Sequence, residues 1–139
     1  MKRVALFIGV NPEGKILLQH KTANAPTNAN LWVLFGGSIE DGEEPEEAVK
    51  REINEELQLK IEPNFFKTYK HEESWGVVER NIFYGDINVS LDQLITILTE
   101  GDNVGFFSSG EIESLLINKN HLAIISEFLK SSKYLTNKS

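Results

Sequence analysis

The sequence contains no cysteine, which excludes disulfides, zinc–thiolate sites, iron–sulfur clusters and thiol nucleophiles. It also lacks an excess of positive charge, because 14 basic residues stand against 21 acidic ones and the net charge is −7. An acidic chain is poorly suited to nucleic acid polymers, since binding them needs lysine and arginine to displace counterions. We therefore expect no nucleic acid partner.

Long hydrophobic runs are absent as well. The N-terminal run Val4–Val10 is much shorter than the roughly 18 residues of a membrane-spanning helix, and it has no signal-peptide cleavage pattern. We therefore expect a cytoplasmic protein with no membrane partner. What remains is an ordinary composition: 139 residues, 40% of them hydrophobic and 25% charged, suit one globular domain over residues 1–139.

Hydrophobic periodicity and turn residues predict an α/β fold with a mixed β-sheet. The segments Val4–Val10 and Lys15–His20 predict a hairpin around a turn at Asn11–Gly14. Pro45 suits the first turn of a helix, which we expect over Pro45–Leu57. The other expected elements are strands at 31–35, 65–74, 77–89 and 104–108, a short helix from Ser108 or Ser109 to 117, and a helix at 120–130. We expect a polar loop at 21–30 and fraying at 131–139.

The net charge is concentrated in one segment. Nine acidic and two basic residues lie between Glu40 and Glu56, whereas the rest of the chain carries 12 of each sign. The helix macrodipole accounts for three of these acids, because the first helical turn favours negative charge. These three are Glu44, Glu46 and Glu47.

The other glutamates of this helix, Glu52, Glu55 and Glu56, share one arc of its surface. That arc lies beside an apolar stripe made by Val49, Ile53 and Leu57. Like charges at this spacing repel, and at the edge of a core they are costly unless a cation neutralises them. An all-oxygen cluster suits a hard divalent ion. Spacing alone leaves two interpretations open, a metal site and a solvated acidic face.

The spacing of the whole segment resembles the Nudix box. Gly37 is followed after five residues by Glu43, and after seven more by the run Arg51–Leu59, which reads REINEELQL. Every defined position of the box matches except one, where Gln58 replaces glycine. A non-glycine residue there should be strained by about 1 kcal/mol or should end the helix differently. Just before the box, Phe35 stands where many family members have proline.

The resemblance, which covers residues 37–59, implies a Nudix-type α/β/α sandwich. It implies hydrolysis of a nucleoside diphosphate linked to another group, with Mg²⁺ as cofactor and Mn²⁺ able to substitute. By this resemblance Glu52, Glu55 and Glu56 bind the metal, and the Gly37 carbonyl is a frequent further ligand. It also implies that two further residues pair across the loop–helix junction and hold the metal-binding glutamates in place. These two are Glu43 and Arg51.

A glutamate beyond the box often completes the metal site or acts as the base in this family. We favour Glu100, because the run from Glu100 to Phe107 resembles the Glu-Gly segment of MutT-like members. A simple turn at Glu100-Gly101 is the alternative. Both Glu55 and Glu100 are candidates for the general base. The other acids considered for this position are Glu72, Glu73, Glu79 and Glu111, of which Glu111 is better explained by a helix dipole.

Substrate contacts are the least specific part of the pattern. His20 ends a strand beside the polar loop and could meet phosphates, and Asn30 in that loop could hydrogen-bond a base or ribose. Trp32 and Phe35 could stack on a base. For each residue the alternative is an ordinary role in a strand end, a loop or the core. The short chain favours a nucleoside triphosphate or an 8-oxo-dGTP-like nucleotide over ADP-ribose or a nucleotide sugar.

Two functions of other classes compete with hydrolysis. One is a non-catalytic nucleotide sensor on the same fold, and the other is a structural domain stabilised by Ca²⁺ or Mg²⁺. The complete set of Arg51 and the three metal glutamates argues against the sensor, and the spacing of Gly37, Glu43 and Arg51 argues against the structural domain. A homodimer is compatible with the resemblance.

Overall fold

A computed structural model describes residues 1–98 and 103–134. By their packing the residues fall into two units. The first comprises Met1–Ile8 and Phe35–Gly85, and the second comprises Gly9–Leu34 and Asp86–Ser139. The organisation as a single domain stays a prediction.

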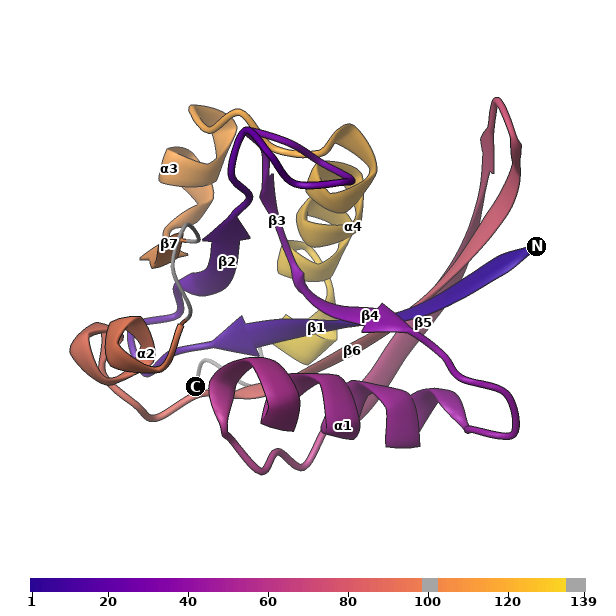
Figure 1. The fold of residues 1–139 in the computed structure, drawn as a ribbon. Coiled ribbons are helices and arrows are strands. Elements are labelled where there is room, and N and C mark those ends of the chain that lie inside the picture. Colours follow the sequence, from indigo (N-terminus) through magenta and orange to yellow (C-terminus); the bar gives the residue numbers. More distant parts are fainter. Residues whose placement is uncertain (99–102, 135–139) are drawn as a thin grey trace. The chain divides into compact units, whose positions relative to one another are not determined.

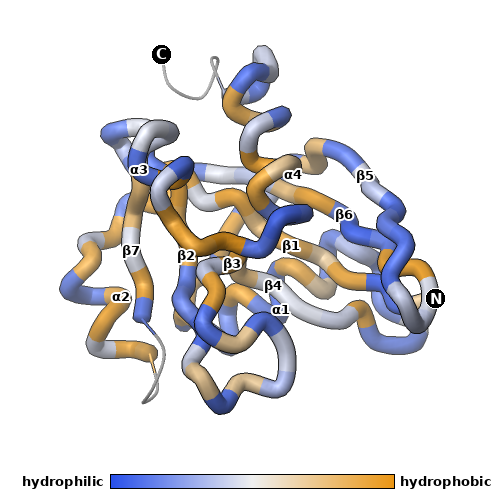
Figure 2. Tube along the Cα trace, turned by 90° about the horizontal axis from the view of Figure 1, so that it is seen from above, coloured by the Kyte–Doolittle hydropathy of each residue, from blue (hydrophilic) through white to orange (hydrophobic). Residues whose placement is uncertain are grey.

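The first unit is built on strands that flank β1 (Lys2–Val10). Strand β4 (Phe35–Ser38) pairs with β1 in antiparallel register. Strand β6 (Gly76–Asp86) lies next to β1 in the strand order. Strand β5 (Asn64–Glu73) pairs with β6 in a long antiparallel hairpin. Hydrophobic residues dominate β1 and hydrophilic ones dominate β5, which agrees with the burial of the first and the exposure of the second (Figure 2).

Helix α1 (Pro45–Leu57) begins and ends where the sequence predicts. It packs on β4 (Figure 1). The side chains of the predicted apolar stripe and of Ala48 are fully buried. A capping box closes its N-terminus: the Glu44 side chain accepts from the backbone of Glu47, and the Glu47 side chain accepts from Glu44 N–H at 2.8 Å. These first-turn acids therefore have a local structural role.

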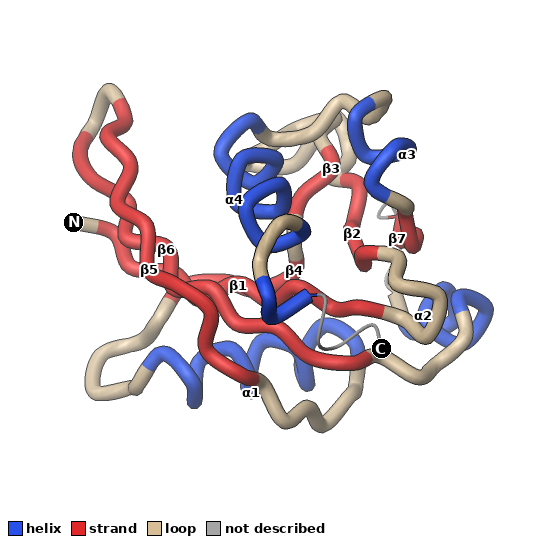
Figure 3. The backbone as a smooth tube through the Cα atoms, turned by 180° about the vertical axis from the view of Figure 1, so that it is seen from behind, coloured by secondary structure: helices blue, strands red, loops and turns tan. Residues whose placement is uncertain are grey.

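The second unit is built around β2 (Ile16–His20). This strand pairs antiparallel with β3 (Trp32–Val33) and β7 (Asn103–Phe107), and its Ile16 pairs with Val10 of β1, as the predicted hairpin requires. The described part of this unit also includes the helices α2 (Leu91–Ile97), α3 (Ser109–Glu113) and α4 (Lys119–Leu129). Figure 3 shows α4 beside β3. The expected α/β class is confirmed.

Helix α2 was not predicted from the sequence. The strand expected at 77–89 is present as β6 but already ends at Asp86, and α2 follows it. Its start is marked by a capping box, in which Ser90 accepts from Gln93 N–H at 3.2 Å and Gln93 accepts from Ser90 N–H at 3.0 Å. A serine followed three residues later by glutamine is the sequence signal that identifies such a start.

The strand expected at 31–35 is divided. Val33 pairs with Gln19 of β2, and Phe35 pairs with Phe7 of β1. Leu34 lies between the two ladders, and its N–H donates to Nδ1 of His121 at 3.1 Å. Both residues are buried, so this hydrogen bond satisfies a donor that no sheet partner satisfies.

The chain near the C-terminus is anchored rather than frayed as far as it is described. The Tyr134 hydroxyl donates to the Gly14 carbonyl at 2.9 Å, and its ring packs edge-on against Phe128. The expectation of fraying over 135–139 lies outside the described residues. Among the described helices, none has the length and apolar character needed to cross a membrane.

Gln58, the one departure from the box, ends α1 in the left-handed conformation, with φ 54° and ψ 36°. Its N–H donates to the Asn54 carbonyl at 2.9 Å, so the helix ends as it would with glycine.

We expect Gln58→Gly to raise the free energy of unfolding by about 1 kcal/mol, because glycine adopts this conformation without strain. Urea unfolding of both proteins measures the change. Gln58→Ala is the control, and an equal gain from alanine would contradict the explanation.

Candidate active site

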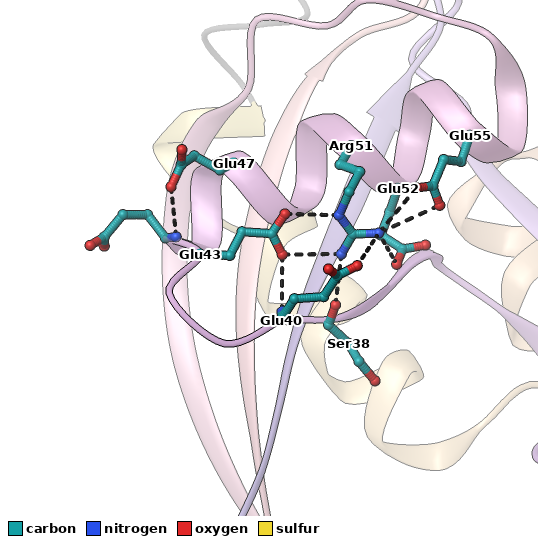
Figure 4. Close-up of polar contacts among 8 residues, drawn as sticks. Ser38, Glu40, Glu43, Glu47, Arg51, Glu52 and Glu55 are labelled. Atoms are coloured by element: carbon teal, nitrogen blue, oxygen red, sulfur yellow. Dashed lines mark hydrogen bonds and ion pairs between the residues drawn. The ribbon is translucent and has the colours of Figure 1, made fainter.

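An ion pair joins the middle of α1 to the loop that precedes this helix. Arg51 donates from Nε to one Glu43 oxygen at 2.8 Å and from Nη2 to the other at 3.1 Å (Figure 4). Two parallel bonds of this kind need the planar fork of arginine, which lysine does not have. The predicted pairing of Glu43 and Arg51 is therefore present in the structure.

The same guanidinium holds three further groups. Nη2 donates to the Ser38 carbonyl at 3.0 Å, and Nη1 donates to Glu52 Oε1 at 2.9 Å. Nη1 also lies 3.3 Å and 3.4 Å from the two Glu55 oxygens. Arg51 is thus the centre of a network that links the end of β4, the loop and the helix. Glu40 adds a longer ion pair to Nη1 at 3.4 Å.

The charges of the central pair stabilise each other. Hydrogen bonds from Arg51 are the main cause that lowers the pKa of Glu43, and the Glu40 N–H adds to this effect. The bond to Glu43 is likewise the main cause that raises the pKa of Arg51, with Glu52 and Glu55 contributing. Both groups therefore stay ionised around neutral pH.

Two of the predicted metal-binding glutamates lie against the glycines of β4. A Cβ atom on Gly37 would come within 2.6 Å of the Glu52 carboxyl carbon, so any side chain there would displace that carboxylate. Glu56 Oε1 accepts a hydrogen bond from Gly36 N–H at 3.2 Å. Gly36 has φ 140°, and a Cβ atom there would clash with the Ala5 carbonyl. The bare backbone of β4 therefore lets helix carboxylates approach it.

The carboxylates of α1 do not form a ready metal cluster. Among the residues that the structure describes, no three acidic or imidazole groups are grouped so that they could hold an ion. Arg51 stands between Glu52 and Glu55, and Glu56 faces a backbone N–H. The sequence argument that these charges need a metal ion to neutralise them was thus too strong, because Arg51 supplies positive charge for two of them.

The donor chemistry nevertheless fits a hard divalent cation. Glu52, Glu55 and Glu56 offer carboxylate oxygens along one face of α1, and Gly37 lies beside Glu52 with no side chain between them. Glu55 is the most exposed of these three glutamates, with 57% of its side chain exposed. Glu100, the favoured glutamate beyond the box, lies outside the described residues.

Three of the other glutamates considered for that position have partners elsewhere. Glu79 pairs with Arg3 at 2.8 Å, which is the main cause of its lowered pKa. Glu73 lies 3.8 Å from Arg80. Glu111 caps α3 with Ser108, as the helix-dipole explanation predicts, and these bonds lower its pKa. Structural contacts therefore account for these three acids.

The predicted substrate residues of the second unit form a group. The rings of His20 and Trp32 lie 5.1 Å apart, and His20 Nε2 lies 3.2 Å from the Asn30 carbonyl oxygen. Trp32 also packs edge-on against Phe107, with ring centroids 4.8 Å apart. Trp32 and His20 are partly exposed, and Asn30 is exposed.

Phe35 does not belong to this group. Its side chain is 0% exposed, in the core of the first unit. Burial of this kind argues against the prediction that Phe35 stacks on a base. This burial explains why the position before Gly36 is hydrophobic.

Comparison with known proteins agrees with this geometry. The sequence matches the NUDIX domain family over residues 1–122. The chain belongs to the NUDIX family. This match agrees with the expected enzyme class, a Nudix pyrophosphohydrolase.

Solved structures share the fold of this Nudix domain at low sequence identity. The MutT protein from Methanosarcina mazei Go1 superposes with a TM-score of 0.75 at 20% identity, covering 94% of this chain and 96% of that chain. The MutT protein from Bacillus halodurans gives 0.72 at 21% identity, covering 94% and 84%. The NUDIX domain of Shewanella oneidensis NrtR, crystallised with ADP ribose, gives 0.70 at 17% identity, covering 89% and 83%. The expected Nudix-type sandwich is thereby confirmed.

Some residues of this Nudix site were not predicted from the sequence. The Ser38 carbonyl and the Gly36 N–H act through their backbone, which carries no residue-specific signal. Glu40 joins the Arg51 network only because the loop folds back on the helix. A separate signal could have marked Gly36, since a double glycine after a short strand indicates close backbone approach.

The lowered pKa of Glu43 predicts an acid-sensitive contribution to stability. A carboxyl group with a lowered folded-state pKa stabilises the fold above its unfolded value, and this contribution is lost as the pH falls through the folded value. We therefore expect wild-type stability to fall more than that of Glu43→Gln as the pH drops below 4.5, the ordinary Glu value. Urea unfolding at neutral and acidic pH measures both. Glu62→Gln, at an exposed position, is the control, and equal acid sensitivity of wild type and Glu43→Gln would refute the assignment.

Proposed function

We propose that this Nudix hydrolase cleaves a nucleoside diphosphate-linked substrate in a Mg²⁺-dependent reaction, with a nucleoside triphosphate or an 8-oxo-dGTP-like nucleotide as the favoured substrate. The observation that carries the proposal is the Arg51 network, which orders Glu43, Glu52 and Glu55 around one guanidinium. ADP-ribose or a nucleotide sugar is the second candidate. It is favoured by the similarity to the NrtR domain crystallised with ADP ribose.

The cation would be held by Glu52, Glu55 and Glu56, with the Gly37 carbonyl as a further ligand. These are hard oxygen donors, which suit Mg²⁺ or Mn²⁺ and do not select strongly between the two. When bound, a divalent cation neutralises phosphate oxygens and lowers the pKa of water in its vicinity. The negative charge of this segment is then compatible with a polyphosphate substrate.

The chain itself supplies orientation and a base. Arg51 holds the Glu55 carboxylate from Nη1, and the exposure of Glu55 leaves it accessible to water. Glu55 takes the proton of the attacking water at a carboxylate oxygen, and Glu100 is the alternative base. Glu43 acts through Arg51, so its role is positioning.

On the substrate side, the proposal uses the group of His20, Asn30 and Trp32. The partly exposed indole of Trp32 offers a face on which a base can stack, and Phe107 supports it at its edge. His20 and Asn30 supply polar atoms next to that face. A homodimer and a cytoplasmic location stay predictions.

We expect Glu55→Gln or Glu56→Gln to lower turnover by roughly two or more orders of magnitude while the fold stays intact, because each removes a charged oxygen donor or base. Steady-state hydrolysis of the best substrate measures the loss, and circular dichroism checks the fold. Glu46→Gln on the same helix is the matched control, because Glu46 is exposed and pairs only loosely with Lys50 at 3.6 Å. Near wild-type hydrolysis by Glu55→Gln or Glu56→Gln would show that the assignment of these residues is wrong.

A hydrolysis screen identifies the substrate. Purified protein with and without Mg²⁺ is tested on nucleoside triphosphates, 8-oxo-dGTP, ADP-ribose, dinucleoside polyphosphates and GDP-sugars, and the products are identified. The proposal expects Mg²⁺-dependent release of a nucleoside monophosphate or diphosphate from the favoured class. Inactivity across the panel would favour a nucleotide sensor instead.

A further inference from the structure

We propose that Asn118 is a positioning residue that holds the segment Asn28–Trp32 in place for substrate binding. The proposal rests on the proposed role of Asn30 and Trp32 and adds a residue that the Nudix box does not contain. Asn118 precedes α4 and lies far along the sequence from this segment, but the fold brings the two together within the second unit.

Backbone hydrogen bonds first bring the two segments together. Trp32 N–H donates to the Leu116 carbonyl at 2.9 Å, and Asn118 N–H donates to the Trp32 carbonyl at 3.1 Å. A parallel bridge between Trp32 and Ile117 results. The backbone on both sides of Trp32's side chain is thus tied to the residues that lead into α4.

The side chain of Asn118 performs two tasks at once. Its Oδ1 caps α4 by accepting from Asn120 N–H at 2.9 Å and from His121 N–H at 3.2 Å. Its Nδ2 donates to Asn28 Oδ1 at 2.8 Å. One amide therefore connects the first turn of a helix to the loop that carries Asn30.

The loop needs such an anchor because its backbone is locally strained. Asn28 and Asn30 have φ values of 58° and 63°, in the left-handed region that few non-glycine residues adopt. Short-range bonds shape it, such as Leu31 N–H to the Asn28 carbonyl at 3.0 Å and Asn30 N–H to the Lys21 carbonyl at 3.1 Å. Much of the loop is exposed, so packing contributes little to its stability, and polar contacts hold it in place.

These contacts predict a specific kinetic signature. Loss of the Asn28–Asn118 bond would loosen the substrate-binding loop and leave the helix carboxylates chemically unchanged. The expected effect is a rise in KM of about three- to tenfold, the range for one neutral hydrogen bond, with kcat within about twofold of wild type.

Two substitutions at position 118 separate capping from positioning. In Asn118→Ser a hydroxyl still caps α4, but the shorter side chain does not reach Asn28. In Asn118→Asp a carboxylate oxygen caps α4, and the other oxygen accepts from the Asn28 amide once that amide rotates. We expect the serine variant to raise KM and the aspartate variant to restore it. Asn88→Ser, at an exposed position, is the matched control.

A third substitution tests the same bond from the other side. Asn28→Gly keeps the left-handed backbone without strain but removes the acceptor. Because it breaks the same bond as Asn118→Ser, the double variant should raise KM no more than either single variant. Additive effects in the double variant would overturn the proposal.

A readout without substrate keeps this proposal distinguishable from the proposed function. The chain has two tryptophans, and Trp75 is 63% exposed at the tip of the β5–β6 hairpin, so Trp75→Phe leaves Trp32 as the only indole fluorophore. In that background we expect acrylamide to quench Trp32 fluorescence more strongly in Asn118→Ser and Asn28→Gly than in the parent protein. In Asn118→Asp and Asn88→Ser we expect the same quenching as in the parent protein. Unchanged quenching in the first two variants would overturn the proposal. If the wild type hydrolyses no nucleotide, the proposed function fails, and quenching still decides the positioning role of Asn118.

Discussion

The candidate site depends on the guanidinium of Arg51. It binds both oxygens of Glu43, the carbonyl of Ser38 and the carboxylate of Glu52, so one side chain joins the loop, the end of β4 and the helix. Charge-assisted bonds of this kind are strong and directional. The acids of α1 are therefore ordered around a cation that belongs to the chain, and the positions of Glu52 and Glu55 follow from it.

A second constraint acts with the first, because helix carboxylates can approach a strand only where that strand has no side chains. Gly36 meets this requirement through its positive φ and its close approach to Ala5, and Gly37 through the space that the Glu52 carboxylate occupies. The two glycines are thus required for two separate physical reasons. Gly36 allows β4 to pair closely with β1, and Gly37 leaves room for a carboxylate of α1 beside the backbone of β4.

Local signals predicted much of this protein. Helix α1 has the predicted bounds, since Pro45 and the spacing of Val49, Ile53 and Leu57 are short-range features. Predictions failed where the secondary structure of a segment depended on partners that are distant in the sequence. The expected strand at 31–35 is divided at Leu34, because its two halves pair with different strands. Helix α2 was missed although its Ser90–Gln93 capping box was a readable signal.

The sequence by itself determined which acids share one face of α1, because their spacing is fixed by helical geometry. The pairing of Glu43 with Arg51 and the family of the chain followed from the resemblance to the Nudix box, which is a pattern of residue types at fixed spacing. Only the tertiary structure decided that Arg51 binds the Ser38 carbonyl, that Phe35 is buried, and that Asn118 holds Asn28. Such partners are set by how distant segments pack, and the bond between Asn28 and Asn118 joins residues 90 positions apart.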